Sequence, residues 1–304
     1  MKRIIMAMAM AVAALPVARA CDVCGCAASN QYLGLLPQFQ RNFIGFQQQY
    51  SEYTSTHPSA YMGRPWEQGA DYYNTFQLWG RYNINRHYQV FVFVPYHYNV
   101  HNEDSAHATG NGIGDITLLV NRQLLNKQKG HWQQTLQAGA GIKLPTGKYT
   151  GITQLDKEGL PNMQPGTGSW DFVVNGNYTV RRKMIGANAD ASYTLTTANK
   201  YSYKYGNRLN TGILAFYNVS AGKINLLPQA GVRYEYTLHD YDNYSHKWLN
   251  DQSGGYMCFA TAGVQAYYRQ VGMRVLYQLP LAQYYSTGYL TAHHKLETGV
   301  FFLF

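Results

Sequence analysis

The stretch Glu297-Thr298-Gly299-Val300-Phe301-Phe302-Leu303-Phe304 ends the chain and decides the fold that we predict. Its residues alternate as they do in a β-strand whose two faces meet different surroundings. Phe302 and Phe304 share one face, and Glu297 and Gly299 share the other. We expect the phenylalanine face to meet lipid and the other face to line a lumen, as in a strand of a transmembrane β-barrel.

The same ending resembles the carboxy-terminal signal that the Gram-negative outer-membrane assembly machinery recognises on β-barrels. The resemblance implies the outer membrane of a Gram-negative bacterium as the location, with the assembly machinery and outer-membrane lipid as partners. Residues 1–20 agree, because they start with Lys2 and Arg3, continue with an apolar run and end on small residues. This pattern predicts a secretory signal peptide. An anchoring helix is the alternative, but the run is short and contains a proline.

Composition supports a barrel rather than other membrane or soluble classes. Charged residues form only 13% of the chain, against about 25% in typical soluble domains. Tyrosine (28) and glycine (29) are abundant. No long apolar run follows residue 20 and mean hydropathy is -0.35, so we do not expect a helical membrane protein. The net charge of +9 does not indicate nucleic-acid binding, because the basic residues are scattered and the chain is predicted to be exported.

Residues 41–304 read as one all-β domain, a transmembrane antiparallel barrel of about twelve strands. Residues 21–40 form a short cysteine-rich segment in front of it, which we expect in the periplasm. Short turns and long polar loops alternate along the chain, and the short ones are expected on the periplasmic side. The predicted strands are 42–53, 72–84, 88–100, 113–126, 132–145, 169–180, 185–196, 208–221, 224–238, 256–269, 272–285 and 291–304.

Charges inside the strands are expected to point into the lumen, because an unpaired charge facing lipid costs about 2–4 kcal/mol near the midplane. Ion pairs that brace a narrow barrel are one explanation for them, since buried charges are normally paired. A path for substrate is the other. The residues assigned to inward rows are Arg81, Asp115, Lys143, Asp171, Asp190, Arg208, Arg233, Glu235, Arg274 and Glu297.

Three motifs stand in order between Gly112 and Asp171: Gly112-Ile113-Gly114-Asp115, Gly141-Ile142-Lys143-Leu144-Pro145-Thr146-Gly147, and Pro165-Gly166-Thr167-Gly168-Ser169-Trp170-Asp171. Together they resemble a family of outer-membrane barrels assigned to transport in phenol-degradation meta-pathways. The resemblance implies a barrel that passes or binds small molecules, including hydrophobic ones. Without the family, Asp115, Lys143 and Asp171 fall at the loop-side ends of three consecutive strands. There they could pair and hold the long loop that begins at Lys148.

Three cysteines, Cys21, Cys24 and Cys26, lie within six residues at the predicted start of the mature chain. Thiolates at this spacing can share one soft metal ion, so copper or zinc is a candidate cofactor. A disulfide or redox pair is an alternative in the oxidising periplasm. Lipidation of Cys21 or an inert segment is another. Cys258 lies in a predicted strand and reads as a small apolar residue on its lipid face.

Three functions follow from these patterns. The first is an outer-membrane transporter or porin for small molecules, and the second is a barrel that anchors a metal or metal cofactor. The third is a membrane hydrolase, which needs a nucleophile, a base and an orienting group within reach. No serine motif accompanies His293 or His294, so we do not expect an enzyme.

Overall fold

The computed structural model describes residues 41–57, 67–103, 106–150, 162–243, 246–250 and 252–304. The predicted signal peptide (1–20) and the cysteine-rich segment (21–40) lie outside these residues. Among the described residues, no helix is long and apolar enough to cross a membrane.

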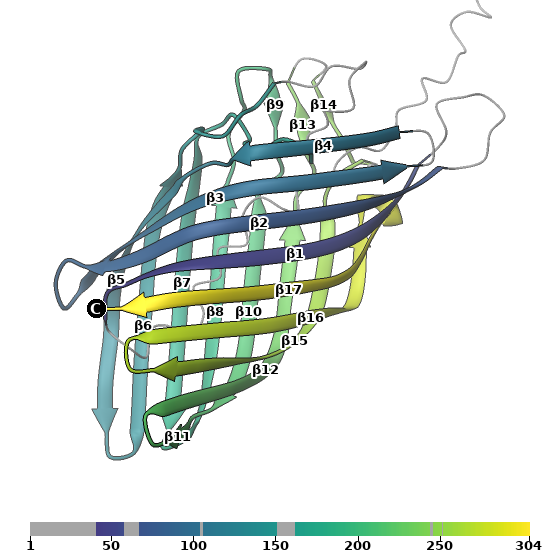
Figure 1. The fold of residues 1–304 in the computed structure, drawn as a ribbon. Coiled ribbons are helices and arrows are strands. Elements are labelled where there is room, and N and C mark those ends of the chain that lie inside the picture. Colours follow the sequence, from purple (N-terminus) through teal and green to yellow (C-terminus); the bar gives the residue numbers. More distant parts are fainter. Residues whose placement is uncertain (1–40, 58–66, 104–105, 151–161, 244–245, 251) are drawn as a thin grey trace, which may run out of the picture.

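Twelve long antiparallel strands close into a barrel (Figure 1). Each strand is hydrogen-bonded to its neighbours in sequence, and the first also pairs with the last, from Phe43 opposite Leu303 to Ser55 opposite Leu290. The predicted fold class and the predicted outer-membrane location are therefore confirmed. The barrel strands are β1 (Phe43–His57), β2 (Glu67–Asn83), β3 (Tyr88–Glu103), β5 (Thr117–Lys129), β6 (Trp132–Lys143), β7 (Asp171–Arg182), β8 (Ile185–Leu195), β10 (Arg208–Tyr217), β12 (Ile224–Thr237), β15 (Gly255–Tyr268), β16 (Val271–Tyr285) and β17 (Leu290–Leu303).

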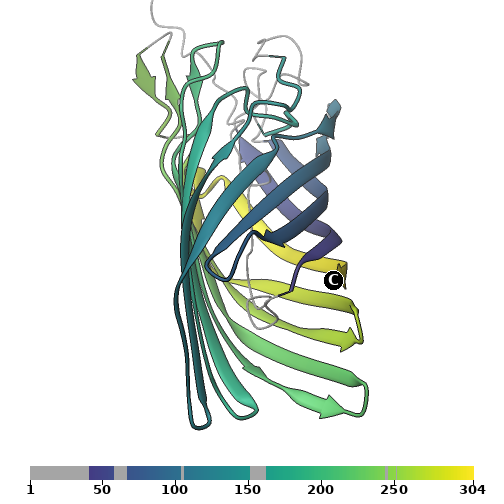
Figure 2. The ribbon, with the colours of Figure 1, turned by 90° about the vertical axis from the view of Figure 1, so that its left-hand side faces the viewer.

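Smaller elements extend the barrel at the loop end. The segment predicted as the loop 101–112 is instead an extension of β3 together with β4 (Ala106–Ile113), which pairs with it as a hairpin. Two other predicted loops contribute a three-stranded sheet of β9 (Tyr203–Lys204), β13 (Tyr241–Asp242) and β14 (Lys247–Trp248). The remaining elements are β11 (Val219–Ala221) and the short 3-10 helix η3 (Ser286–Gly288). Figure 2 shows the long connections at one end of the barrel and the tight turns at the other.

Alternation sorts the strand residues into an outer and an inner surface. The outer rows carry exposed apolar side chains, as a surface in contact with hydrocarbon requires. On β7, for example, Phe172 and Val174 are exposed, whereas the alternate residues Val173 and Asn175 are buried. Phe302 and Phe304 also lie on the outer surface, and Glu297 is buried inside.

An apolar cluster fills part of the interior. It contains five stacked or edge-on ring pairs, among them Phe43–Trp79 with centroids 4.5 Å apart and Trp79–Phe93 at 6.0 Å. Because these side chains point inward, they line the lumen rather than contact lipid. The members of this lumen aromatic cluster are Phe43, Trp79, Phe91, Phe93, Leu119, Val173, Phe216, Leu227, Tyr267, Phe301 and Leu303.

Candidate functional site

Three charged residues meet at the loop-side ends of β5, β6 and β7. Lys143 and Asp171 stand directly opposite each other across the ladder, with the Lys143 Nζ 2.5 Å from Asp171 Oδ2. The same Nζ lies 3.5 Å from Oδ2 of Asp115, just before β5. All three side chains are buried. A buried ammonium is thus flanked by two carboxylates, which is the pairing that burial of charge requires.

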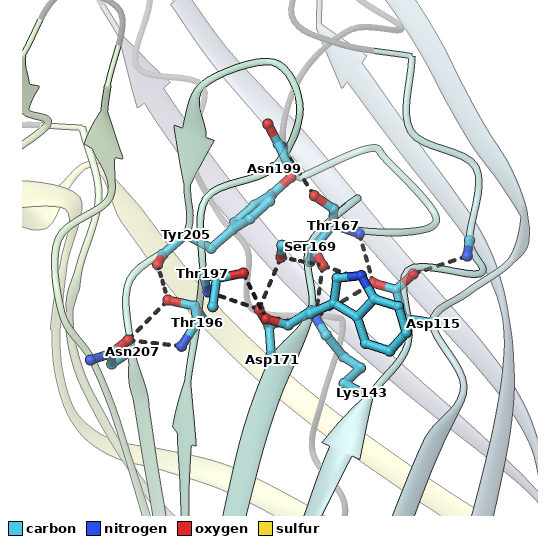
Figure 3. Close-up of polar contacts among 12 residues, drawn as sticks. Asp115, Lys143, Thr167, Ser169, Asp171, Thr196, Thr197, Asn199, Tyr205 and Asn207 are labelled. Carbon is cyan, nitrogen blue, oxygen red and sulfur yellow. Dashed lines mark hydrogen bonds and ion pairs between the residues drawn. The ribbon is translucent and has the colours of Figure 1, made fainter.

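Asp115 holds the two ends of the long loop together (Figure 3). Its Oδ1 accepts a hydrogen bond from the Gly147 backbone N–H at 2.9 Å. Its Oδ2 accepts two more from the backbone N–H and the hydroxyl of Thr167, both at 2.8 Å. Gly147 and Gly166 pack so closely that a Cβ on either would lie 2.7 Å from a backbone atom of the other. We call Asp115, Lys143, Thr167 and Asp171 the loop clamp.

The loop clamp also reaches the next connection along the chain. Asp171 Oδ1 accepts hydrogen bonds from the Ser169 hydroxyl at 2.9 Å and from the Thr197 backbone N–H at 3.1 Å. Asn199 donates to the Thr167 carbonyl oxygen at 3.0 Å. Two adjacent loops are therefore fixed to one buried charge centre, as Figure 3 shows.

Beyond the loop clamp, residues 162–167 turn into the barrel. All six are buried, and Met163 packs against Ala108 of β4. Asn162 donates from Nδ2 to the Tyr73 hydroxyl at 3.0 Å, and Asn99 donates to the Asn162 carbonyl oxygen at 3.4 Å. Tyr73 and Asn99 lie on the inner rows of β2 and β3. The segment therefore crosses the loop-side part of the lumen, and we call it the inner segment.

The loops above the lumen are packed around one buried carboxyl group. Asp240 accepts hydrogen bonds from the Tyr203 hydroxyl at 2.5 Å and the Gly206 backbone N–H at 2.6 Å. Burial raises the pKa of Asp240 above its usual value, although both hydrogen bonds act in the opposite direction. Burial likewise raises the pKa of Tyr203 and Tyr205 well above the ordinary value. We call this assembly of Tyr203, Tyr205 and Asp240, which lies outside the membrane, the tyrosine cap. Its burial favours the neutral form of all three side chains.

Six of the other inward charges form pairs that are separate from the loop clamp. Arg274 lies 2.9 Å from Glu297 and donates to Gln47 at 3.2 Å. Arg233 lies 3.7 Å from Asp190. Glu235 is bound at 2.7 Å by Lys295, a residue absent from the predicted set although it shares the face of Glu297.

The two remaining predicted arginines lie at opposite ends of the barrel. Arg81 is buried beneath the Phe43 ring, 5.3 Å from its centroid, and donates to the Arg41 carbonyl oxygen. Arg208 is buried at the start of β10. All ten predicted lumen charges are thus shielded from the outer surface.

Another pair of buried ionisable residues, Asp71 and His101, is absent from the residues predicted from the sequence. His101 Nδ1 lies 2.6 Å from Asp71 Oδ1, and Glu103 lies 3.8 Å from the other ring nitrogen. The predicted second and third strands were too short at the loop end to include Asp71 and His101. Lengthening each predicted strand by one residue would have placed both of them on inner rows.

Below the loop clamp, β5 to β8 present a wall of buried carboxamides without charge. Asn188 donates to Asn177 at 3.0 Å and to Thr179 at 2.7 Å. Among the described residues, neither polar side-chain atom of Asn175 has a hydrogen-bond partner, and the same holds for Gln229 on β12. Buried amides seek partners, so these groups are available to water or to a solute. The amide wall consists of Asn121, Gln137, Asn175, Asn177 and Asn188.

The cysteines cannot be placed in this geometry. Cys21, Cys24 and Cys26 lie outside the described residues. The described Cys258 is a free thiol, half-buried in an outward row of β15. Among the residues that the structure describes, no group of three or more His, Cys, Asp or Glu side chains could hold a metal ion.

Comparison with known proteins connects the chain to solved structures rather than to sequence relatives. No family model matches it, and no curated protein matches it. It is similar to an outer-membrane channel from Pseudomonas putida F1, with 13% identity and a TM-score of 0.62 over 87% of this chain and 96% of that one.

Two further matches have lower TM-scores. They are the β domain of the Bordetella autotransporter BrkA (10% identity, TM-score 0.47, 86% of this chain and 99% of that one) and the translocator domain of NalP from Neisseria meningitidis (12%, 0.40, 86% and 88%). At such low identity, the likeness to the channel shows the fold alone. The chain has the fold of an outer-membrane β-barrel.

Proposed function

We propose that this barrel is an outer-membrane channel for small uncharged molecules that combine an apolar ring or chain with hydrogen-bonding groups. The observation that carries the proposal is the division of the lumen surface. Most of its charged side chains are held in ion pairs, whereas the amide wall retains unmet hydrogen-bonding capacity. The lumen aromatic cluster adds an apolar surface beside it.

This lining does not favour a path for ions. The Arg274–Glu297 pair is neutral as a unit. In the loop clamp two carboxylates share one ammonium, but their oxygens already accept hydrogen bonds from the loop backbone and hydroxyls, so they are occupied by the protein rather than open to a passing ion. Carboxamides and aromatic rings bind neutral solutes through hydrogen bonds and apolar contact. The family resemblance of the three glycine-rich motifs, with its implication of phenol-degradation transport, supports the same class of solute.

A flux assay on reconstituted protein tests the proposal. Liposome swelling is measured with neutral aromatic alcohols, with sugars of similar size and with matched carboxylates, alongside ion conductance in planar bilayers. We expect the neutral aromatic solutes to enter fastest. Entry of charged solutes at an equal or higher rate would contradict the proposal.

The substitution Phe93→Ala opens the lumen aromatic cluster, and Phe172→Ala makes the same change on the outer surface. If the lumen is the path, only Phe93→Ala alters the relative rates of aromatic and non-aromatic solutes. Equal effects of the two substitutions would argue against a lumen path.

The terminal strand β17 has a second role in this proposal, as the segment that the assembly machinery recognises. Its two outward phenylalanines are exposed at the end of the chain, and Phe304 is hydrogen-bonded through its backbone N–H to Asn42. Replacing Phe304 by Ser is expected to lower the amount of barrel in the outer membrane in cells while leaving refolding in detergent unchanged.

A further inference from the structure

The charges of this barrel are strongly segregated along its length. Each of the five tight turns carries or adjoins basic side chains, and no Asp or Glu side chain lies in these turns or in the neighbouring parts of their strands. Within the described residues, every Asp and Glu lies in the lumen or toward the loop end. The exposed basic side chains of the turn end form a basic collar of Arg41, Arg86, His87, Arg122, Lys127, Lys129, His131, Arg182, Lys183, Lys223 and Arg269.

Aromatic rings fix several of these cations at the level of the membrane interface. Arg182 lies over the Trp132 ring at 5.4 Å, and Arg122 lies over Tyr88 at 5.8 Å. Arg269 lies over Tyr268 at 5.4 Å. All three rings are exposed on the outer surface, where tryptophan and tyrosine mark the boundary between hydrocarbon and headgroups. The guanidinium groups are therefore held beside lipid headgroups.

A surface cavity, open to the outside, lies within the collar between the β5–β6 turn and the end of β7. Its volume is about 490 Å³, and it is lined by Lys129, Gly130, His131, Trp132, Gln134 and Arg182. Two permanent cations from different hairpins face it, together with an imidazole and the indole. Its size falls in the range of small-molecule sites, and Figure 1 shows the β5–β6 hairpin at the lower edge of the barrel.

We propose that this cavity binds the phosphate headgroup of an anionic phospholipid from the periplasmic leaflet. Lys129 and Arg182 contact the phosphate oxygens, since basic side chains at a bilayer surface attract anionic lipid. Trp132 packs against the glycerol and upper acyl chain, because its ring is exposed to the lipid side. The site is separate from the lumen, so it does not depend on which solute the channel carries.

A fluorescence titration tests the proposal directly. The refolded barrel in a neutral detergent is titrated with brominated phosphatidylglycerol and, separately, with brominated phosphatidylcholine, and quenching of indole emission is recorded. Repeating the titration with Trp132→Phe isolates the signal of the indole in the cavity. We expect saturable quenching by phosphatidylglycerol that weakens at high salt, and we expect Trp132→Phe to lose this saturable component while the other exposed indoles, such as Trp170, are still quenched.

The site variant combines Lys129→Gln, His131→Gln and Arg182→Gln. The matched control, Lys200→Gln with His246→Gln and Lys247→Gln, removes the same kinds of charge from exposed positions at the loop end. We expect about thirtyfold weaker phosphatidylglycerol binding for the site variant, from the loss of two permanent charges near the lipid surface. The control variant is expected to bind as the native barrel does.

Two competitors identify the ligand. Inorganic phosphate at millimolar concentration is expected to compete weakly with phosphatidylglycerol. A poly-glutamate peptide is expected to compete no better than inorganic phosphate. Equal quenching by both lipids, equal weakening of both variants, or stronger competition by the acidic peptide than by the anionic lipid would overturn the proposal. The last result would instead identify the basic collar as a protein-docking surface.

Discussion

Lys143 and Asp171 are cross-strand partners at the mouth of the lumen, with their charged atoms 2.5 Å apart and both side chains buried. Beside this pair, Asp115 accepts hydrogen bonds from Gly147 and Thr167, the two ends of a loop whose inner segment lies inside the barrel. The buried charges of the loop clamp therefore determine where a lumen-crossing segment is held. The predictions below follow from this arrangement and from the surfaces around it.

Replacing Lys143 by Met removes the cation and leaves two buried carboxylates facing each other. Breaking a buried ion pair on one side costs roughly 3–5 kcal/mol, and we expect the loop clamp rather than the barrel to yield. Single-channel conductance in planar bilayers should rise, and the loop should be cut faster by protease. The exposed residue Lys127, near the turn end of β5, gives the matched control, Lys127→Met, which should change neither property.

The substitution Gly110→Ala tests the position of the inner segment by steric means. A Cβ on Gly110 would lie 1.9 Å from the Met163 carbonyl oxygen, so the segment must move. We expect increased solute flux and faster hydrogen exchange in residues 162–167. Gly176→Ala is the control, because the nearest atom to its Cβ would be 3.9 Å away. Unchanged flux in Gly110→Ala would show that the inner segment does not obstruct the path.

Replacing Asn175 by Leu tests the amide wall, because the change keeps the side-chain volume close but removes the hydrogen-bonding groups. We expect a severalfold fall in the entry of phenol-like solutes relative to benzene-like solutes. The neighbouring Val174→Leu alters the outer row instead and should leave this ratio unchanged. Liposome swelling with paired solutes measures the ratio, and an equal fall for both solute types would point to simple blockage.

The tyrosine cap should loosen as the pH rises. The pKa of Asp240 is raised by burial, so the folded cap keeps its proton at a pH where the unfolded segment has lost it. Stability from this group is therefore complete below the ordinary pKa of about 3.9 and is lost as the pH rises through the folded value. Hydrogen exchange of residues 199–207, corrected for its intrinsic pH dependence, should report this change. Asp240→Asn should abolish the pH dependence, and its persistence would assign it to another group.

The cysteine-rich segment makes a separate prediction. If Cys21, Cys24 and Cys26 share a metal, anaerobically purified barrel should contain about one copper or zinc ion per chain. The Cys24→Ser, Cys26→Ser double variant should contain none, and Cys258→Ser should bind as the native chain does. Elemental analysis measures the content. Metal-free native protein would favour the disulfide or lipidated alternatives.

Period-two alternation and turn residues were sufficient to predict the barrel from the sequence, because each strand contacts lipid on one face and the lumen on the other. The positions of Asp115, Lys143 and Asp171 also followed from strand ends alone. The position of the inner segment could not be predicted in this way. Loop residues have no periodicity, and the place of this loop depends on a clamp formed by three strands that are distant in sequence. The β3–β4 hairpin is also absent from the predicted strands, because residues 101–112 are polar and read as a loop.

Lys295 is within reach of the sequence pattern, because it lies two residues before Glu297 and on the same face. The loop-side part of β17 shows a different limit. The pairing of β1 with β17 shifts between Glu52 and Tyr53, so that His293 is skipped and Ala292 faces inward, although alternation from Lys295 would place it outward. Such a bulge resets the alternation without any mark in a single strand. Asp71 and His101 were missed because strand ends are the least certain feature of a sequence pattern.

The pairing of β1 with β17 also governs the order of events during folding. Contacts between the two ends of a chain are slow to form, because the longest possible loop must close first. Until Leu290–Leu303 arrives, the sheet has two open edges that can pair with other chains. A copy that stops short of that strand is therefore a template for aggregation, and the fourteen residues of β17 remove this hazard by covering both edges.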